Sequence, residues 1–336
     1  MAAEVAVALR LPYILTAAMG AICLVLAAAA PGQALEKVSL RLHWVHQAQF
    51  AGFYMAQDLD LYRQAGLEVT IRPGGPGRPH PLHELASGGV DFGTSWLTEA
   101  MAQRGQGVEL VHLGQLIQRS ALLIITFADR RIVTPDDLAG RRVGMWRDFF
   151  AIPPRALFRR LNIEVREIDQ SVTMSALLTR AVDAATAMLY NEYHQLYQAG
   201  VDFEDLRTFH FADLGLNFPE DGIYALRSTW ETRPEVCRRF TQASLEGWRR
   251  AMADPEAALA AVMRRINEAH LASNESHQRW MLKVMLELIT HRVGRDKMGE
   301  LSAKDLALVN GVLITQGFLK NLVAYDEFAV DAWRRP

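Results

Sequence analysis

A loop rich in aromatic and amide side chains, HWVHQAQF, occupies residues 43–50. It carries Trp44, Gln47 and Gln49, and Phe53 and Tyr54 follow shortly after it. Aromatic rings stack on flat ligands, and amide and hydroxyl groups donate or accept hydrogen bonds. These residue types include no obvious nucleophile. The stretch therefore indicates a site that holds a molecule, and we expect a protein that is not an enzyme and has no catalytic residue.

The segments around this loop read as strand, loop, helix, turn and strand. Residues 38–42 alternate apolar and polar side chains, as a strand does, and residues 51–62 carry apolar side chains at helical spacing. Gly66 can end that helix, and LEVTI then restarts a strand. A loop that follows the carboxyl end of a strand and leads into a helix is where open α/β sheets bind ligands. The loop is therefore the expected binding site.

Composition and charge narrow the class of protein. The chain has 336 residues, of which 50% are hydrophobic and 22% are charged, so it can bury a substantial core, which we expect in two domains. Lys and Arg number 36 against 38 for Asp and Glu, which gives a net charge of −2. This balance gives no support for nucleic acid as a partner.

The N-terminal segment, residues 1–34, resembles a secretory signal peptide. Arg10 precedes an uncharged run from Leu11 to Ala30, and Gly32-Gln33-Ala34 places small residues where a signal peptidase reads. We expect cleavage near Ala34 and export to the periplasm; the alternative is an uncleaved anchor, because the run is nearly long enough to span a membrane. After cleavage, Cys237 is the remaining cysteine, which excludes an internal disulfide and a cysteine metal cluster.

The rest of the chain alternates strands and helices and then becomes helical from Pro234 onward. Repeated strand–helix units indicate an α/β fold with a largely parallel sheet and helices on both faces. We expect residues 37–126 and 226–336 in lobe 1 and residues 127–225 in lobe 2, with the helical C-terminal third packed around lobe 1. Two crossings between lobes imply a hinge that can close over a ligand.

Several motifs resemble those of the NMT1/THI5-like periplasmic solute-binding proteins. The run LHWVHQAQFAGFYMAQDLDLYRQAGLEV is similar to the opening signature of that family, and the resemblance continues through VDFGTSWLTEAMAQRGQGVELV, TPDDLAGRRVGMW and AATAMLYNEYHQLYQAGVD. It implies a two-lobed, type II periplasmic-binding-protein fold in a monomer without a cofactor. The implied partners are a small-molecule ligand and the permease and ATPase of an ABC importer. The best-known ligands of the family are pyrimidine precursors of thiamine, such as hydroxymethylpyrimidine and formylaminopyrimidine.

The resemblance also implies which residues bind the ligand. Trp44 matches the family's tryptophan, which resembles a stacking wall for a flat ring, and Tyr54 matches the tyrosine that follows. In the second lobe, Glu192 would accept two hydrogen bonds from an aminopyrimidine edge, although its spacing from Asn191 differs from the family pattern. The complete set of expected ligand-binding residues is Trp44, Gln49, Tyr54, Thr94, Ser95, Gln118, Ser120, Asn191 and Glu192.

The identity of the ligand stays open at this point. HWVHQAQF departs from the thiamine-precursor version of this loop, which usually carries Thr-Pro-Asn, so a sulfonate or an aromatic carboxylate is an alternative ligand. A sensory module that serves a membrane histidine kinase is an alternative role. An enzyme similar to the fungal pyrimidine synthase would need that family's CCCFC motif, and the chain lacks this motif.

Several of the aromatic residues and histidines also have a purely structural interpretation. Trp96, Trp146 and Tyr224 fall near the expected face between the lobes, yet each could belong to the core. The histidine pairs 43 and 46, and 80 and 83, have a spacing of three in extended loops, which does not bring two imidazoles together on one metal ion. We therefore expect no metal site.

Overall fold

The computed structural model describes residues 34–291, 294 and 297–334. The predicted signal segment lies outside these residues, apart from its last position. Within the described part of the chain, no helix combines the length and the apolar character needed to cross a membrane.

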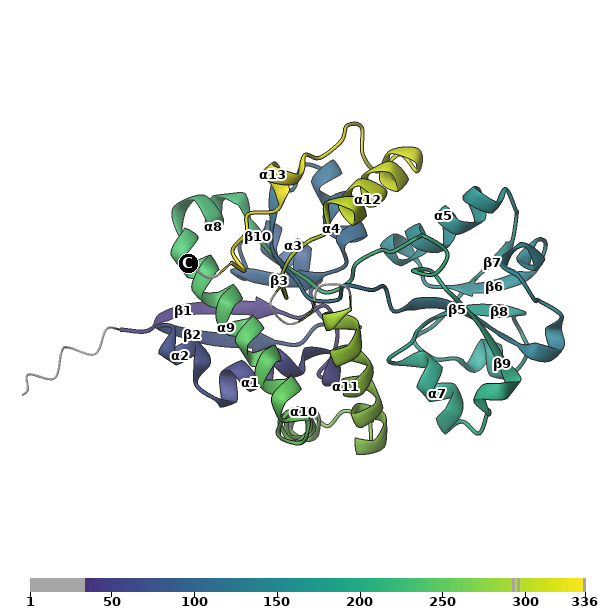
Figure 1. Cartoon of the computed structure of the whole chain (residues 1–336), viewed down its shortest axis with the longest axis horizontal. Coiled ribbons are helices and arrows are strands. Elements are labelled where there is room, and N and C mark those ends of the chain that lie inside the picture. Colours follow the sequence, from purple (N-terminus) through teal and green to yellow (C-terminus); the bar gives the residue numbers. More distant parts are fainter. Residues whose placement is uncertain (1–33, 292–293, 295–296, 335–336) are drawn as a thin grey trace, which may run out of the picture. The chain divides into compact units, whose positions relative to one another are not determined.

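The first of two five-stranded sheets in the described chain forms the centre of lobe 1 (Figure 1). Its strand order is β2-β1-β3-β10-β4, in which β1 runs parallel to β2 and β3, whereas β10 runs antiparallel to β3 and β4. The strands are β1 (Glu36–Arg41), β2 (Leu67–Arg72), β3 (Phe92–Ser95), β4 (Leu110–Gln115) and β10 (Gly222–Leu226).

The second sheet forms the centre of lobe 2 and has the order β7-β6-β8-β5-β9. Strand β6 runs parallel to β7 and β8, whereas β5 runs antiparallel to β8 and β9. Both sheets are therefore mixed rather than largely parallel, because the strand that enters each lobe from the other lobe inserts antiparallel. The strands are β5 (Leu122–Phe127), β6 (Arg142–Met145), β7 (Arg166–Asp169), β8 (Ala184–Met188) and β9 (Leu206–His210).

Two crossing segments connect the sheets. The chain leaves the first sheet after Gln115 and enters the second at Leu122, and it returns between His210 and Gly222. The predicted lobe boundaries, 126/127 and 225/226, fall inside β5 and β10, whereas the change of sheet occurs just before these strands. The apolar run ALLIITF fits the interior of either sheet, so its pattern could not show which sheet it joins.

Helices cover both sheets, and the prediction of a helical C-terminal third is confirmed (Figure 1). The helices on lobe 1 are α1 (Ala51–Asp58), α2 (Leu61–Gln64), α3 (Pro81–Ala86), α4 (Leu97–Gly105), α8 (Arg227–Thr232), α9 (Pro234–Ala253), α10 (Pro255–Glu268), α11 (Glu275–Thr290), α12 (Ala303–Thr315) and α13 (Tyr325–Phe328). The helices on lobe 2 are α5 (Ile152–Leu161), α6 (Ser175–Leu178) and α7 (Glu192–Gln198).

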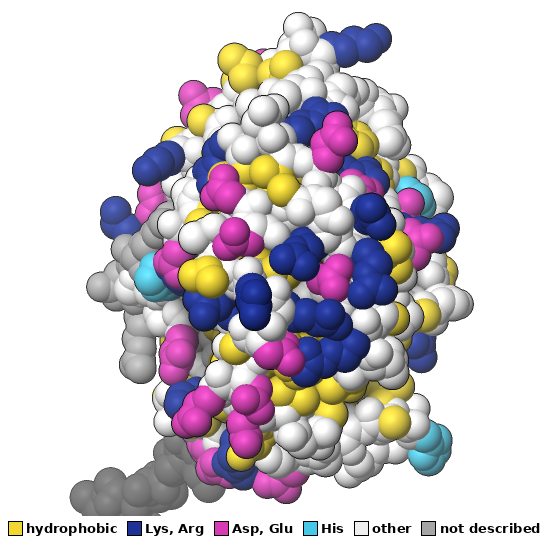
Figure 2. Space-filling model, turned by 90° about the vertical axis from the view of Figure 1, so that its right-hand side faces the viewer, with side chains coloured by type: hydrophobic (Ala, Val, Ile, Leu, Met, Phe, Trp, Pro, Cys, Tyr) yellow, Lys and Arg dark blue, Asp and Glu magenta, His cyan; other side chains and the backbone are white. Residues whose placement is uncertain are grey.

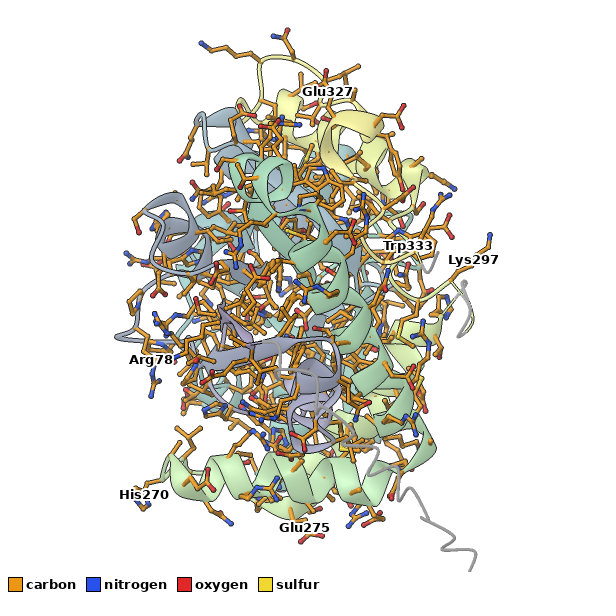
Figure 3. The ribbon with its side chains drawn as sticks, turned by 90° about the vertical axis from the view of Figure 1, so that its left-hand side faces the viewer. Arg78, His270, Glu275, Lys297, Glu327 and Trp333 are labelled. Carbon is orange, nitrogen blue, oxygen red and sulfur yellow. The ribbon has the colours of Figure 1, made fainter. Side chains whose placement is uncertain are left out.

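Helices α1 and α9 approach each other very closely. A Cβ atom on Gly52 would lie 2.2 Å from the Trp248 ring, and a Cβ atom on Gly247 would lie 2.1 Å from the Gly52 carbonyl oxygen. Trp248 is fully buried, so its ring cannot move out of the way without opening the core. This contact fixes α1, and with it the preceding loop 43–50, against the long helix that crosses lobe 1 in Figure 3.

The outer side of lobe 2 carries basic and acidic side chains next to one another (Figure 2). Several of its arginines form ion pairs with carboxylates: Arg142 with Asp183 at 3.1 Å, Arg155 with Glu167 at 2.6 Å, and Arg180 with Asp129 at 2.6 Å. Positive charge on this side is therefore compensated locally at these pairs.

Candidate ligand-binding cavity

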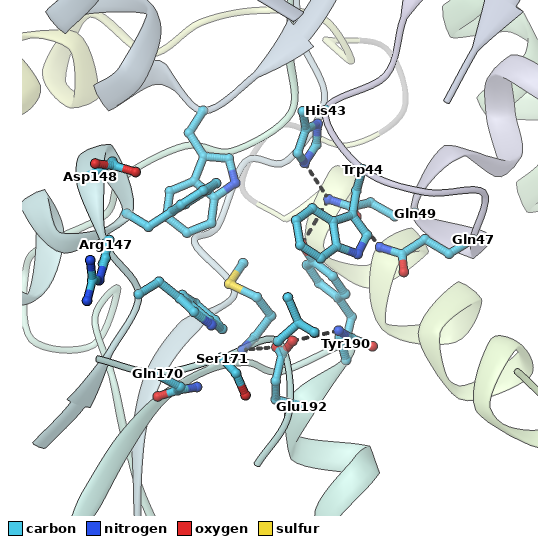
Figure 4. Close-up of a pocket in the computed structure, with 16 residues that line it drawn as sticks. His43, Trp44, Gln47, Gln49, Arg147, Asp148, Gln170, Ser171, Tyr190 and Glu192 are labelled. Carbon is cyan, nitrogen blue, oxygen red and sulfur yellow. Dashed lines mark hydrogen bonds between the residues drawn. The ribbon is translucent and has the colours of Figure 1, made fainter. Parts of the chain in front are cut away.

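A cavity of about 290 Å³ lies between the two lobes (Figure 4). It sits beyond the carboxyl ends of β1 and β3 in lobe 1 and of β6, β7 and β8 in lobe 2. This is the position in which α/β sheets bind ligands. The lining residues are His43, Trp44, Gln47, Gln49, Trp96, Trp146, Arg147, Asp148, Phe150, Gln170, Ser171, Val172, Met188, Tyr190, Asn191 and Glu192.

Aromatic rings from both lobes form much of the cavity wall. Trp44 and Trp96 come from lobe 1, and Trp146, Phe150 and Tyr190 come from lobe 2. The rings of Trp96 and Phe150 meet edge to face across the lobes, with centroids 4.8 Å apart and an interplanar angle of 84°. A flat ligand between the lobes would contact the faces or edges of these rings.

Gln49 is the centre of a hydrogen-bond network behind the aromatic wall. Its Nε2 atom lies 2.8 Å from the Tyr190 hydroxyl of lobe 2, 2.9 and 3.0 Å from the carboxyl oxygens of Asp221, and 3.1 Å from Nε2 of His43. Its Oε1 atom accepts a hydrogen bond from Gln47. Since Asp221 belongs to the returning crossing segment, Gln49 connects loop 43–50 with the second lobe and with that crossing.

Glu192 begins α7 and faces the cavity from lobe 2 (Figure 4). Its Oε2 atom accepts from the Met188 amide at 2.9 Å, and its Oε1 atom accepts from Nδ2 of Asn191 at 2.6 Å. Burial raises the pKa of Glu192 to about 7. A carboxyl group held in this way changes its charge near neutral pH.

The cavity carries little positive charge. Burial lowers the pKa of His43 to about 3, so this imidazole is neutral at physiological pH. Among the described lining residues, Arg147 is the one arginine or lysine, and it forms an ion pair with Asp169 at the exposed rim. Asp148 is also exposed at this rim. The arrangement suits a neutral ligand better than an anion.

Four of the residues expected from the sequence line the cavity: Trp44, Gln49, Asn191 and Glu192. Tyr54 does not line it, because the residue is fully buried and its hydroxyl lies 2.8 Å from Nδ1 of His46. The position of Tyr54 on α1 matched the family motif, but the packing of α1 turns this side chain into the core.

Thr94 and Ser95 also lie behind the cavity wall rather than in it. The Thr94 hydroxyl lies 3.0 Å from the amide nitrogen and 2.9 Å from Nδ1 of His43, so it orients an imidazole that does line the cavity. The Ser95 hydroxyl donates to the Glu99 carboxylate. Neither hydroxyl reaches the cavity in this structure.

Gln118 and Ser120 lie in the outgoing crossing segment, away from the cavity. Nε2 of Gln118 donates to the Glu300 carbonyl oxygen at 3.0 Å, and the Ser120 hydroxyl donates to Glu220 of the returning crossing at 2.5 Å. These two side chains stabilise the crossing segments. We do not include them among the residues that contact the ligand.

Several lining residues were not among the ligand-binding residues expected from the sequence, although a signal for them exists. Trp146, Gln170 and Tyr190 follow the carboxyl ends of β6, β7 and β8, and of these three only Trp146 had been noted in the sequence, as a residue that could also belong to the core. The same rule that singled out the loop after β1 would have selected these positions. The remaining lining residues not singled out are Arg147, Asp148, Phe150, Ser171, Val172 and Met188.

The histidines of the paired motifs contact different partners. Nε2 of His80 lies 2.7 Å from Glu99, and Nε2 of His83 lies 3.0 Å from Nε2 of Gln103. Within the described part of the chain, no group of three or more His, Cys, Asp or Glu side chains is arranged to hold a metal ion.

The comparisons with known proteins give the family. Residues 47–258 match the family model described as NMT1/THI5 like. The chain belongs to the NMT1/THI5-like family. This confirms the resemblance on which the sequence analysis relied.

Two relatives carry names that state a ligand. The riboflavin-binding protein RibY of Chloroflexus aurantiacus is 27% identical over 263 residues, which cover 75% of this chain and 72% of RibY. The formylaminopyrimidine-binding protein of Halalkalibacterium halodurans is 23% identical over 271 residues, which cover 77% of this chain and 79% of that protein.

Solved structures confirm the two-lobed periplasmic-binding-protein fold. The aliphatic sulphonate binding protein SsuA of Escherichia coli superposes with a TM-score of 0.66 at 15% identity, covering 88% of this chain and 92% of SsuA. The desulfurization enzyme DSZB superposes with a TM-score of 0.57 at 15% identity, covering 89% of this chain and 97% of DSZB. Binding proteins and at least one enzyme therefore share this fold.

Proposed function

We propose that this protein is the periplasmic solute-binding component of an ABC importer and that it captures a small, flat heteroaromatic molecule. The observation that carries the proposal is the cavity wall, in which Trp44, Trp96 and Trp146 and two further rings enclose the space from both lobes. Riboflavin and formylaminopyrimidine, which two relatives are named for binding, are both nitrogen heteroaromatics. A pyrimidine precursor of thiamine and riboflavin are therefore the leading candidates.

We propose binding without turnover. None of the described residues that line the cavity is a cysteine, and the hydroxyl of Ser171 lies 3.0 Å from that of Thr173. The nitrogens of His43 and the oxygens of Glu192 already form hydrogen bonds within the protein. A general base must be free to reach a proton on the substrate, and these groups are engaged elsewhere.

The charge of the cavity argues against a sulfonate as ligand. Removing a permanently charged sulfonate from water is costly unless a cation is free to pair with it. Arg147 is already paired with Asp169 and sits at the exposed rim. The likeness to SsuA therefore supports the fold of this chain, and its cavity favours a different class of ligand.

The remaining features of the proposal follow from the importer role. Residues 1–34 would export the chain as a cleaved signal peptide, and the partners would be the membrane permease and its ATPase. We propose that the protein acts as a monomer, since closing of two lobes over one ligand needs no second copy.

Thermal melting of the purified protein tests this function. The ligands are hydroxymethylpyrimidine, formylaminopyrimidine, thiamine, riboflavin, taurine and an aromatic carboxylate. A ligand at a hundred times its dissociation constant adds about 2.7 kcal/mol to the free energy of unfolding, which raises the melting temperature measurably. We expect a shift with a flat heteroaromatic and none with taurine. A shift with taurine alone would replace the proposed ligand class with sulfonates.

A further inference from the structure

The indole groups at the cavity have hydrogen-bond donors that no protein group uses. In the described part of the chain, no acceptor contacts Nε1 of Trp44, Trp96 or Trp146. These atoms also retain accessible surface, in contrast to Nε1 of Trp248, which is sealed in the core without a partner. Trp96 is 4% exposed, and it lines the cavity.

Tyr190 adds a fourth donor. Its hydroxyl oxygen accepts from Nε2 of Gln49 at 2.8 Å, and among the described residues no acceptor takes the hydroxyl hydrogen. An indole N–H can only donate, and a tyrosine hydroxyl that already accepts one hydrogen bond has its own proton left to donate. These four groups come from both lobes, so a ligand that fills the cavity meets donors on several sides.

Most acceptors of the wall, in contrast, are occupied. Oε1 of Gln49 accepts from Gln47, and Nε2 of His43 lies 3.1 Å from Nε2 of Gln49 and 3.3 Å from Oδ1 of Asp221. Oδ1 of Asn191 lies 3.0 Å from Nε2 of His277 and 3.2 Å from Nε2 of Gln195. Both carboxyl oxygens of Glu192 accept from protein groups. Oε1 of Gln47 is the lining amide oxygen for which the described residues provide no donor.

The excess of unpaired donors over free acceptors in the cavity wall determines which hydrogen-bonding groups a bound ligand needs. A ligand that fills the cavity removes water from the indole and tyrosine donors. The free-energy cost of leaving a buried donor without an acceptor is larger than the net free energy that a formed hydrogen bond contributes. An amino group on the ligand would place a second donor opposite them. A ring nitrogen or carbonyl oxygen would instead complete the missing bonds.

We infer that the ligand is an acceptor-rich heteroaromatic, a ring system bearing oxo groups and unprotonated ring nitrogens, rather than an amino-substituted ring. The inference rests on the proposed function, because it assumes that this cavity is where the ligand binds. It also changes the expected role of Glu192, since an amino edge would compete with the Met188 amide and the Asn191 side chain for the same oxygens.

A matched pair of pteridines tests the inference. 1,3-Dimethylpteridine-2,4-dione and 2,4-diaminopteridine have the same bicyclic ring, but the first presents oxo groups and ring nitrogens without an N–H donor, whereas the second presents two amino groups. Their dissociation constants are measured on the full protein by quenching of tryptophan fluorescence at pH 7.5. We expect the dione to bind at least about tenfold more tightly, the factor that corresponds to one buried donor gaining rather than losing its partner.

A substitution at Trp96 tests the contribution of its N–H donor separately from that of its aromatic ring. Trp96→Phe keeps an aromatic face and removes Nε1, so the affinity for the dione should fall about three- to tenfold more than the affinity for the diamine, which loses only stacking surface. Trp333→Phe is the matched control, because that indole lies outside the cavity (Figure 3) and its loss should change neither affinity. An equal loss for both pteridines in Trp96→Phe would show that only stacking is involved and would overturn the role of the N–H group.

The outcomes separate this inference from the proposed function. If the diamine binds as tightly as the dione, or if hydroxymethylpyrimidine binds and neither pteridine does, the inference is wrong while the proposed function stands. If no flat heteroaromatic binds, the proposed function fails and the inference fails with it. Preferential binding of the dione that is lost in Trp96→Phe supports both.

Discussion

Nδ1 of His194 on α7 and Nδ1 of His277 on α11 lie 3.0 Å apart, one from each lobe. Nε2 of His277 also lies 3.0 Å from Oδ1 of Asn191, an oxygen that can only accept, so this nitrogen carries the hydrogen. The Nδ1 atom of a neutral His277 is then the acceptor, and His194 is the donor. Because Asn191 lines the cavity, this contact joins the lobes next to the ligand.

The histidine contact predicts that acid weakens ligand binding. Burial, and then the neighbouring His194, lower the pKa of His277 to about 4, whereas a histidine freed by opening of the lobes has a pKa near 6.5. Between these values the open form binds more protons, so lowering the pH through this window favours opening. We expect the dissociation constant of any bound probe to rise on the order of tenfold between pH 7.5 and 5.5.

Two variants isolate the contribution of His277. His277→Gln removes the titrating group and should flatten the pH dependence, whereas His270→Gln, at an exposed position on lobe 1 (Figure 3), should retain it. Glu192 titrates in an overlapping pH range in the wild type and in both variants. The contribution of His277 is therefore the difference in pH dependence between His277→Gln and the other two proteins. An unchanged slope in His277→Gln would show that the histidine contact does not control closure.

The buried carboxyl group of Asp221 predicts that the ligand-free protein becomes less stable as the pH rises. This pH dependence is opposite in sign to the one expected for ligand binding. Burial raises its pKa to about 8 from a usual value near 3.8, so the folded protein holds a proton that the unfolded chain has lost. The free energy of unfolding contributed by this group therefore falls as the pH rises from about 4 to 8. Asp221→Asn should melt at least about 2 °C higher than the wild type at pH 8, and the difference should shrink at pH 5.

Asp60 provides the control for this substitution. Both aspartates have a positive φ, 59° at Asp221 and 54° at Asp60, and asparagine tolerates this backbone conformation well. The side chain of Asp60 is exposed, so Asp60→Asn should leave the pH profile of the melting temperature unchanged. If both substitutions raise the melting temperature equally at pH 8, burial of the carboxyl group is not the cause of the increase.

The contact between α1 and α9 predicts opposite effects of two glycine substitutions. Gly52→Ala would place a methyl group 2.2 Å from the buried Trp248 ring and should lower the free energy of unfolding by about 1–3 kcal/mol. Gly311→Ala lies in the exposed part of α12 with no atom near its new methyl group, and it should raise that free energy by roughly 0.5–1 kcal/mol. Urea denaturation measures both; stabilisation by Gly52→Ala would contradict the close approach.

Much of the fold was predictable because it depends on local patterns. Alternating and helical spacing of apolar residues located the loop after β1, and the family motifs placed Trp44, Asn191 and Glu192, all of which line the cavity. A loop at the carboxyl end of a strand points toward the ligand site whatever the details of packing. Such positions can be found without knowing the tertiary structure.

The differences between the sequence-based expectations and the structure concern features that depend on tertiary packing. Whether Tyr54 faces the core or the cavity depends on the rotation of α1, which the contact with Trp248 fixes, and no local pattern encodes that rotation. Pairing of Trp96 with Phe150 and of Gln49 with Tyr190 depends on how two lobes meet. The antiparallel insertion of β5 likewise depends on where the chain crosses between sheets.

Trp44 provides the most direct test of the cavity itself. Its ring is only partly buried and lies at the cavity wall, so Trp44→Ala should remove a stacking surface without opening the core. We expect the affinity for a flat heteroaromatic ligand to fall at least about tenfold, with a change of less than about 2 °C in the melting temperature of the empty protein. Trp230→Ala is the matched control, since Trp230 is also partly buried but packs beside Arg238 on lobe 1, outside the cavity. Normal binding by Trp44→Ala, measured by titration calorimetry, would place the ligand elsewhere in the molecule even though the fold and family stand.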